Sequence, residues 1–102
     1  MVIEYIRYRI PPDTRTAFLS DYVKAVEYLR ASPVCLGYEL SQCEEDSDSF
    51  VLRIAWQSTA DHLDKFRGSA EFRGFLPLIR PYMSQIEEMR HYAPTELRWN
   101  RS

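Results

Sequence analysis

The chain has 102 residues, of which 45% are hydrophobic and 14% aromatic, and this size and composition favour one globular domain and exclude a disordered chain. Its 13 basic and 15 acidic residues give a net charge of -2, which supplies no field for gathering nucleic acid. No apolar run approaches the roughly 18 residues of a membrane span, and the first ten residues alternate apolar and charged side chains instead of forming a signal peptide. We therefore expect a soluble, cytoplasmic protein without nucleic-acid or membrane partners.

The first third of the chain predicts a strand followed by a helix. Residues 2–10, VIEYIRYRI, alternate with period two and stop at Pro11-Pro12, as a strand would. From residue 13 to 31 the spacing of apolar residues is helical, and Ser32-Pro33 ends the segment. The apolar residues of this predicted helix face are Phe18, Tyr22, Ala25, Val26 and Leu29.

Two strands follow, at residues 35–43 (CLGYELSQC) and 49–57 (SFVLRIAWQ), and the polar turn EEDSD joins them into an antiparallel hairpin. Cys35 and Cys43 lie eight positions apart in one strand, which separates them by about 26 Å in extended chain. We therefore expect two free thiols, as in a reducing compartment, and no disulfide.

The last third predicts two helical pieces and a final strand. Ser58 or Thr59 can cap a short helix that runs to about Arg67, and Ser69 can cap a second one. Prolines at 77 and 81 limit how far regular helix can continue. Residues 84–93, SQIEEMRHYA, are expected to form a fourth strand, although their pattern does not decide which face points inward.

The predicted order β-α-β-β-α-β is that of the ferredoxin-like fold, an α+β domain whose four-stranded antiparallel sheet carries both helices on one face. We assign residues 1–94 to this domain and 95–102 to a C-terminal tail. Both faces of the strands carry apolar residues, so an isolated sheet would expose a mixed patch. We therefore expect a homodimer packed sheet to sheet, which gives a dimeric α+β barrel. On the first strand, Val2, Ile6, Tyr8 and Ile10 face one way, and Ile3 and Tyr5 face the other with Arg7 and Arg9.

A further pattern begins with Trp56 at the end of the third strand. Gln57-Ser58 and a short helix follow it, then Ser69-Ala70-Glu71-Phe72 and Gly74-Phe75-Leu76. From the first strand to about Ala93, the chain resembles the antibiotic biosynthesis monooxygenase family. The resemblance implies a dimeric barrel with a pocket between sheet and helices in each subunit. Some members oxygenate polycyclic phenols or quinols with molecular oxygen and use no metal or flavin, so no cofactor is expected.

The chain departs from the family pattern at several places. Glu71 stands where the family has histidine, and one extra residue separates Trp56 from Ser69. In heme-degrading relatives a helix histidine binds iron and a strand asparagine lies in the pocket, and the corresponding places here are Leu76 and Ile6. The resemblance therefore does not favour heme degradation.

Two residues are the candidates for catalysis, and each has a structural alternative. Trp56 is either a core side chain or a pocket residue whose indole N–H holds an oxyanion on the substrate or on reduced dioxygen. His91 is either a structural residue at the dimer interface or the general base that withdraws a phenolic proton, since a histidine pKa near 6.5 suits that task. His62 is expected on the surface.

Four aromatic residues are the candidates for substrate binding: Tyr8, Tyr22, Phe66 and Phe72. The hydroxyl of either tyrosine could hydrogen-bond a phenolic substrate, and the alternative is a buried tyrosine whose hydroxyl bonds to the backbone. No spacing of histidines, cysteines or acidic residues predicts a metal site. The expected function is oxidation of a small aromatic quinol or phenol by dioxygen without a cofactor. The alternatives are a non-catalytic barrel that binds an apolar small molecule and a heme-handling accessory protein.

Overall fold

The computed structural model describes all residues from Met1 to Ser102 and has the predicted element order, with one short helix on either side of the second main helix. The boundaries agree with those expected from the sequence to within about two residues. The strands are β1 (Val2–Arg9), β2 (Cys35–Gln42), β3 (Ser49–Trp56) and β4 (Ile86–Tyr92). The helices are α1 (Pro12–Ala31), the π-helix η1 (Asp61–Phe66), α2 (Ala70–Ile79) and the 3-10 helix η2 (Arg80–Gln85).

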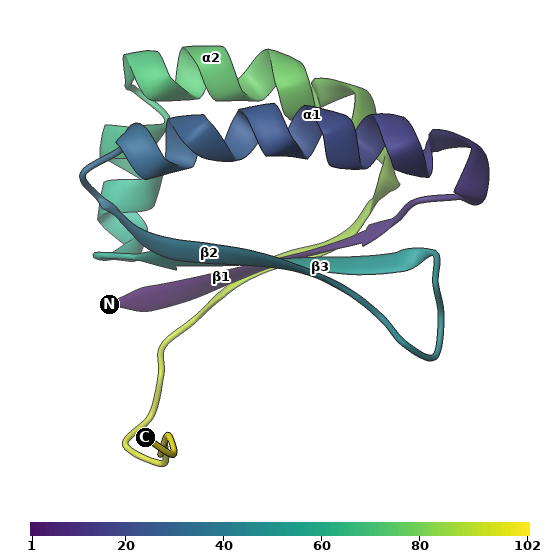
Figure 1. Ribbon diagram of the computed structural model, residues 1–102. Helices are drawn as coiled ribbons and strands as arrows, with labels where there is room; N and C mark the ends of the chain where they lie inside the picture. The colour runs from purple at the N-terminus through teal and green to yellow at the C-terminus, as the bar shows by residue number, and fades with distance from the viewer.

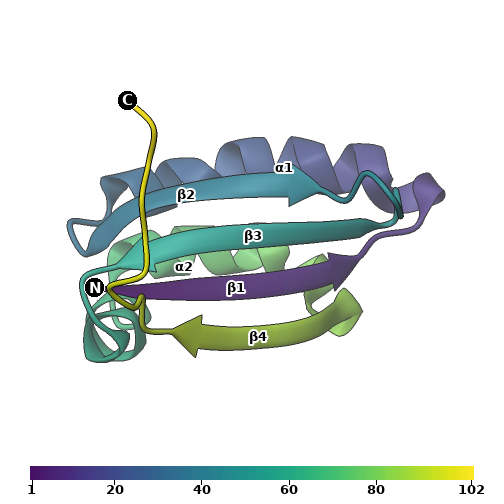
Figure 2. The ribbon, with the colours of Figure 1, turned by 90° about the horizontal axis from the view of Figure 1, so that it is seen from below.

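The four strands form one antiparallel sheet in the order β2-β3-β1-β4, which is the order of the ferredoxin-like fold (Figures 1 and 2). Ile6 in β1 pairs with Leu52 in β3 and with Met89 in β4, so these three side chains share one face. Both long helices cover this face and lie side by side (Figures 1 and 2). The fold class predicted from the sequence is thereby confirmed.

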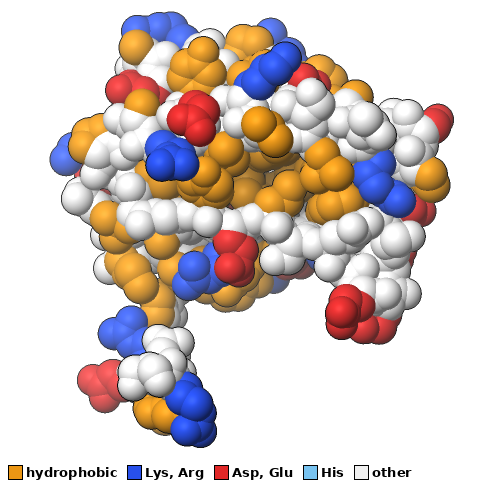
Figure 3. Space-filling view, in the orientation of Figure 1, with side chains coloured by type: hydrophobic (Ala, Val, Ile, Leu, Met, Phe, Trp, Pro, Cys, Tyr) orange, Lys and Arg blue, Asp and Glu red, His pale blue; other side chains and the backbone are white.

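The core fills the space between this face and the helices. Tyr8, Phe50 and Tyr82 surround Phe18 with ring centroids 5.1 to 5.3 Å from its own. At one side of the molecule, hydrophobic side chains gather in a hollow between the helical layer and the sheet, and charged side chains are scattered around it (Figure 3). Burial of these aromatic rings and of the aliphatic core residues holds the helices on the sheet.

The second helical region differs from its prediction in two ways. Residues 61–66 form a π-helix, in which the N–H of Arg67 donates to the carbonyl of His62, five residues earlier, at 3.3 Å. Pro77 lies inside α2 and does not end it. Proline has a helical φ and removes only one backbone donor, while Phe75 and Ile79, both buried, anchor the helix on either side of it.

The opposite face of the sheet carries no helix, and the chain leaves the sheet on that side after β4 (Figure 1). Residues 93–102 have no regular structure, and Leu97 and Trp99 in this segment are 94% and 72% exposed. Cys35 and Cys43 are free thiols, as predicted. None of the helices has the length and apolar character needed to cross a membrane.

Candidate active site

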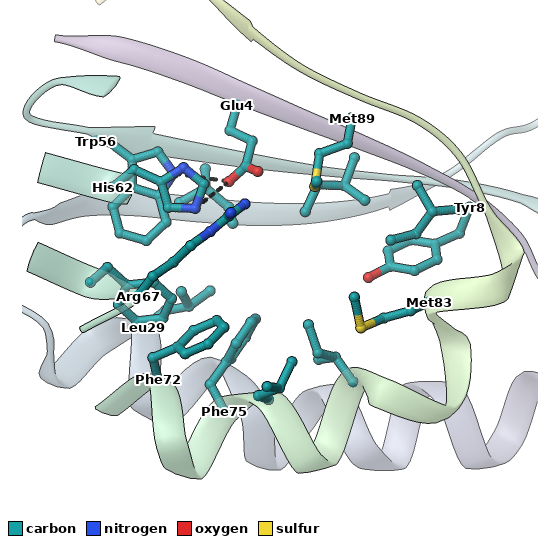
Figure 4. A pocket seen from close by; sticks show the side chains of 16 residues that line it. Glu4, Tyr8, Leu29, Trp56, His62, Arg67, Phe72, Phe75, Met83 and Met89 are labelled. Atoms are coloured by element: carbon teal, nitrogen blue, oxygen red, sulfur yellow. Dashed lines mark hydrogen bonds and ion pairs between the residues drawn. The ribbon is translucent and has the colours of Figure 1, made fainter. Parts of the chain in front are cut away.

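A cavity of about 450 Å³ lies between the helix-covered face of the sheet and the second helical region (Figure 4). Thirteen of its sixteen lining residues are hydrophobic, so it suits a ligand with an apolar body. Phe72 and Phe75 come from α2, Met83 from η2 and Met89 from β4. The three remaining lining residues, Glu4, His62 and Arg67, lie together at one end, which gives the cavity a single charged end (Figure 4).

Glu4 places a carboxylate in this end of the cavity. It lies on the same face of β1 as Val2, Ile6 and Tyr8 and is only 1% exposed. The indole N–H of Trp56 donates to its Oε1 at 3.0 Å. This N–H is therefore engaged by the protein and is not free to hold a substrate oxyanion, which was one of the two roles inferred for Trp56. The Trp56 ring is part of the cavity wall.

His62 is buried at 4% exposure, so the prediction that it lies on the surface is wrong. Its ring stacks on Trp56 with centroids 4.5 Å apart and planes 11° from parallel. Nε2 of His62 lies 3.6 Å from Oε1 of Glu4, and Nδ1 lies 2.8 Å from Nε2 of His91. Because His91 is only partly buried, the three side chains form a continuous path from the cavity towards solvent.

The surroundings shift the pKa of each member of this Glu4–His62–His91 chain. Burial raises the pKa of Glu4, although the hydrogen bond from Trp56 and the charge of Arg67 partly oppose the rise. Burial, together with the charges of Arg67 and His91, lowers the pKa of His62 to about 4. Burial and Arg67 also lower the pKa of His91. Both imidazoles are therefore neutral near pH 7, and Glu4 is a stronger base than an exposed carboxylate.

Tyr8 lies towards the other end of the cavity (Figure 4). Its hydroxyl hydrogen-bonds to that of Tyr22, which comes from α1 and does not line the cavity. Burial raises the pKa of Tyr8 to about 12, and burial also raises that of Tyr22. Both hydroxyls therefore stay protonated at neutral pH, so Tyr8 can offer a neutral hydroxyl to a ligand.

The other two aromatic candidates, Phe66 and Phe72, both line the cavity. Phe66 lies 4.9 Å from Trp56 and 5.4 Å from Phe72 between ring centroids, so the three rings form one continuous aromatic wall. His91 contacts His62 and is not itself a lining residue. The structure thus gathers Trp56, Tyr8, Phe66 and Phe72 around one cavity and places His91 and Tyr22 one layer behind it.

Glu4 and Arg67 are residues of the site that sequence reasoning missed. Glu4 was recognisable as a lone charge on the otherwise apolar face of the first strand. Arg67 had no such signal, because its position depends on the extra residue in the π-helical turn.

The potential ligand atoms of Glu4, His62 and His91 all lie within 4.8 Å of one another, although sequence spacing predicted no metal site. Two imidazoles and a carboxylate are a donor set that divalent transition metals accept. Here, however, each of the three groups already has a protein partner, and the positive charge of Arg67 opposes a second cation. The geometry therefore fits an acid–base chain, with a hydrogen bond between the two histidines and a 3.6 Å contact between His62 and Glu4, better than a metal centre.

Similar proteins have the same fold. A protein from Bordetella bronchiseptica, assigned to the antibiotic biosynthesis monooxygenases, superposes with a TM-score of 0.79 at 19% identity, over 92% of this chain and 96% of that one. A variant of SnoaB, a cofactor-independent oxygenase from Streptomyces nogalater, superposes with a TM-score of 0.75 at 16% identity, over 93% of each chain. The uncharacterized protein YczJ of Bacillus subtilis is 25% identical, over 64% of this chain and 75% of its own length. The sequence profile of the antibiotic biosynthesis monooxygenases matches residues 1–77, and the chain belongs to this family.

Proposed function

We propose that the protein is a monooxygenase that oxidises a small aromatic quinol or phenol with molecular oxygen and without a cofactor. The observation that carries the proposal is the cavity with apolar walls and one charged end, where the buried carboxylate of Glu4 is linked through His62 to His91. Family membership and the similarity to a cofactor-independent oxygenase support it.

The chemistry requires little from the protein, because an ionised hydroxyarene can itself pass an electron to dioxygen. The resulting superoxide and aryloxyl radical combine at a ring carbon. This peroxide anion takes up one proton, which balances the phenolic proton removed earlier, and the hydroperoxide then loses water to leave a quinone. The overall reaction converts the phenol and one O₂ into the quinone and one H₂O. One oxygen atom enters the product and the other leaves as water, and no external reductant is needed. The protein has to exclude water, remove the phenolic proton and stabilise the negative charge that develops.

Glu4 is the group best placed to take the phenolic proton. Its raised pKa brings a carboxylate closer to the range in which a general base works at neutral pH. The neutral imidazole of His62 can accept a proton at one ring nitrogen while it releases another towards His91. In this mechanism His91 passes the proton outward, which differs from both roles inferred from sequence, the direct base and the structural residue at the dimer interface.

The test is oxygen uptake by protein dialysed against a chelator, with a panel of reduced naphthoquinols and anthracene-type phenols. Glu4→Gln keeps an oxygen that can accept the Trp56 N–H but cannot take a proton, and it should lower kcat by about 10²- to 10⁴-fold. Glu71→Gln is the matched control, because Glu71 lies on α2 outside the cavity, and its rate should be unchanged. Wild-type rates in Glu4→Gln, or activity that appears only after a metal is restored, would contradict the proposal.

The second candidate is a protein that binds an apolar small molecule without turning it over. The internal pairing of Trp56, Glu4 and His62 favours it, because these groups need no ligand to satisfy them. Saturable binding of the same phenols without oxygen uptake in any member of the panel would support this candidate. The heme-handling alternative lacks such support. At the two positions where heme-degrading relatives have an iron-binding histidine and a pocket asparagine, this cavity is lined by the apolar side chains of Leu76 and Ile6. A Soret band on titration with hemin would revive it.

A further inference from the structure

Arg67 is the only cationic side chain that lines the cavity. It follows the π-helix η1, and its side chain extends towards Glu4 and His62 (Figure 4). Arginines elsewhere on the surface, such as Arg9 and Arg15, form ion pairs with carboxylates, whereas Arg67 forms none. A guanidinium offers five donors in a planar fork, so Arg67 brings unused capacity for binding an anion to the charged end of an apolar cavity.

We propose that Arg67 is the anion-binding residue of this cavity, and that the ligand is an aromatic compound held there through a negatively charged oxygen, either a phenolate or a carboxylate. The inference rests on the proposed function only in taking this cavity as the ligand site. The proposed function does not specify the charge of the bound ligand, and here the ligand is held as an anion. For a phenol, the guanidinium would stabilise the ionised form, which is the form that reacts with dioxygen.

Glu4 is the obvious alternative partner for Arg67, and the structure argues against that pairing. The carboxylate of Glu4 takes its hydrogen bond from Trp56 and its next contact from His62, and Arg67 makes no ion pair with it. The charges that face the anion site are those of Glu4 on β1, Arg67 after η1, and, when protonated, His62 on η1 and His91 on β4. Near neutral pH an ionised Glu4 would repel the incoming anion. Anion binding should therefore carry a proton onto Glu4, as transfer of the phenolic proton would also do.

The test uses two fluorescent probes of nearly the same shape. 1-Anilino-8-naphthalenesulfonate is an aromatic anion, and N-phenyl-1-naphthylamine is its neutral counterpart without the sulfonate. Arg67→Gln should weaken binding of the anionic probe about tenfold and leave binding of the neutral probe unchanged. Arg67→Lys should retain part of the anion affinity. Arg73→Gln, which removes an exposed arginine of α2 outside the cavity, should change neither probe.

Glu4→Gln should have the opposite effect to Arg67→Gln. It removes the negative charge that repels the anionic probe, so it should tighten binding of that probe near neutral pH. The proposal is overturned if Arg67→Gln leaves the anionic probe unaffected, if it weakens both probes equally, or if wild-type protein binds no anionic probe. Displacement of the bound probe by 2-naphthoate would assign a carboxylate ligand. Displacement by 2-naphthol would assign a phenolate if the absorption spectrum of the bound naphthol shifts to that of naphtholate. Displacement by neither overturns the proposal. None of these measurements needs turnover, so failure to consume oxygen would contradict the proposed function and leave this inference standing.

Discussion

At the scale of single residues, the chain buries a carboxylate and an imidazole together. Apart from tyrosines, Glu4 and His62 are the only ionisable side chains among its fully buried residues. An isolated buried charge costs several kcal/mol, and such groups usually shift their pKa or find partners. Here Glu4 and His62 do both, and they do so at the end of the main cavity. Ionisable groups with shifted pKa values in a cleft mark a candidate functional site, which is how these two residues support the proposed proton transfer.

The low pKa of His62 predicts how folding stability depends on pH. Histidine in the unfolded chain has a pKa near 6.5, whereas His62 in the fold has a pKa of about 4, so the unfolded state binds the proton more readily. The contribution of neutral His62 is therefore complete above about pH 6.5 and is lost as the pH falls towards 4. The loss amounts to at most about 3 kcal/mol. Glu4, whose pKa is raised, gains protons in the fold and partly offsets this loss.

Thermal unfolding between pH 4 and pH 8 checks this expectation. His62→Phe keeps a flat ring against Trp56 but cannot be protonated, so its Tm should fall less steeply below pH 6.5 than that of the wild type. Leu63→Ala, an exposed neighbour without an ionisable group, should keep the wild-type slope. Parallel curves for His62→Phe and the wild type would contradict the assignment of a strongly lowered pKa.

At the scale of elements, Ser69 holds the start of α2 in place. Its Oγ accepts a hydrogen bond from the N–H of Phe72 at 3.2 Å and donates one to the carbonyl of Phe66 at 2.6 Å. Ser69→Ala should lower the free energy of unfolding by about 1 kcal/mol in urea titrations, since it removes the N-cap. Ser69→Thr keeps the hydroxyl and should lose much less. Equal stability of Ser69→Ala and the wild type would show that this cap contributes nothing.

The strands and helices could be predicted from the sequence because their patterns are local. Alternation in residues 2–10 and helical spacing in residues 13–31 each reflect one buried face, and the serine caps could also be recognised. The inward face of β4 could not be predicted, because it depends on the register that pairs His91 with Glu4. The burial of His62 could not be predicted either, because the π-helix, with hydrogen bonds between residues five apart, does not follow the 3.6-residue spacing by which a helix face is recognised. The pairing register of β4 with β1 and the π-helix η1 therefore place the residues of the site that could not be predicted from the sequence.

At the scale of the whole molecule, the two faces of the sheet have different surroundings. The cavity lies on the face that the helices cover, and the other face carries no helix (Figures 1 and 2). Tyr5 and Tyr92 make an edge contact on this open face with ring centroids 5.5 Å apart, and the half-buried Val51 also belongs to it. A second copy packed on this face would cover its apolar side chains. The cavity of each copy lies on the opposite face of the sheet, so the partner would not cover it.

We therefore expect a homodimer in solution, with twice the chain mass of 12.1 kDa in light scattering coupled to size exclusion. In a two-fold interface a substitution appears twice, so Val51→Lys would place two new charges in the contact, beside the existing Arg7 on the neighbouring strand. This variant should elute as a monomer at micromolar concentration.

Val23→Lys is the matched control, because Val23 is 70% exposed on α1, away from the open face, and the variant should remain dimeric. A monomeric wild type, or a dimer unaffected by Val51→Lys, would place the contact elsewhere or exclude it. If the dimer dissociates while the fluorescent probes still bind, each cavity is complete within one chain, and dimerisation serves to cover the sheet.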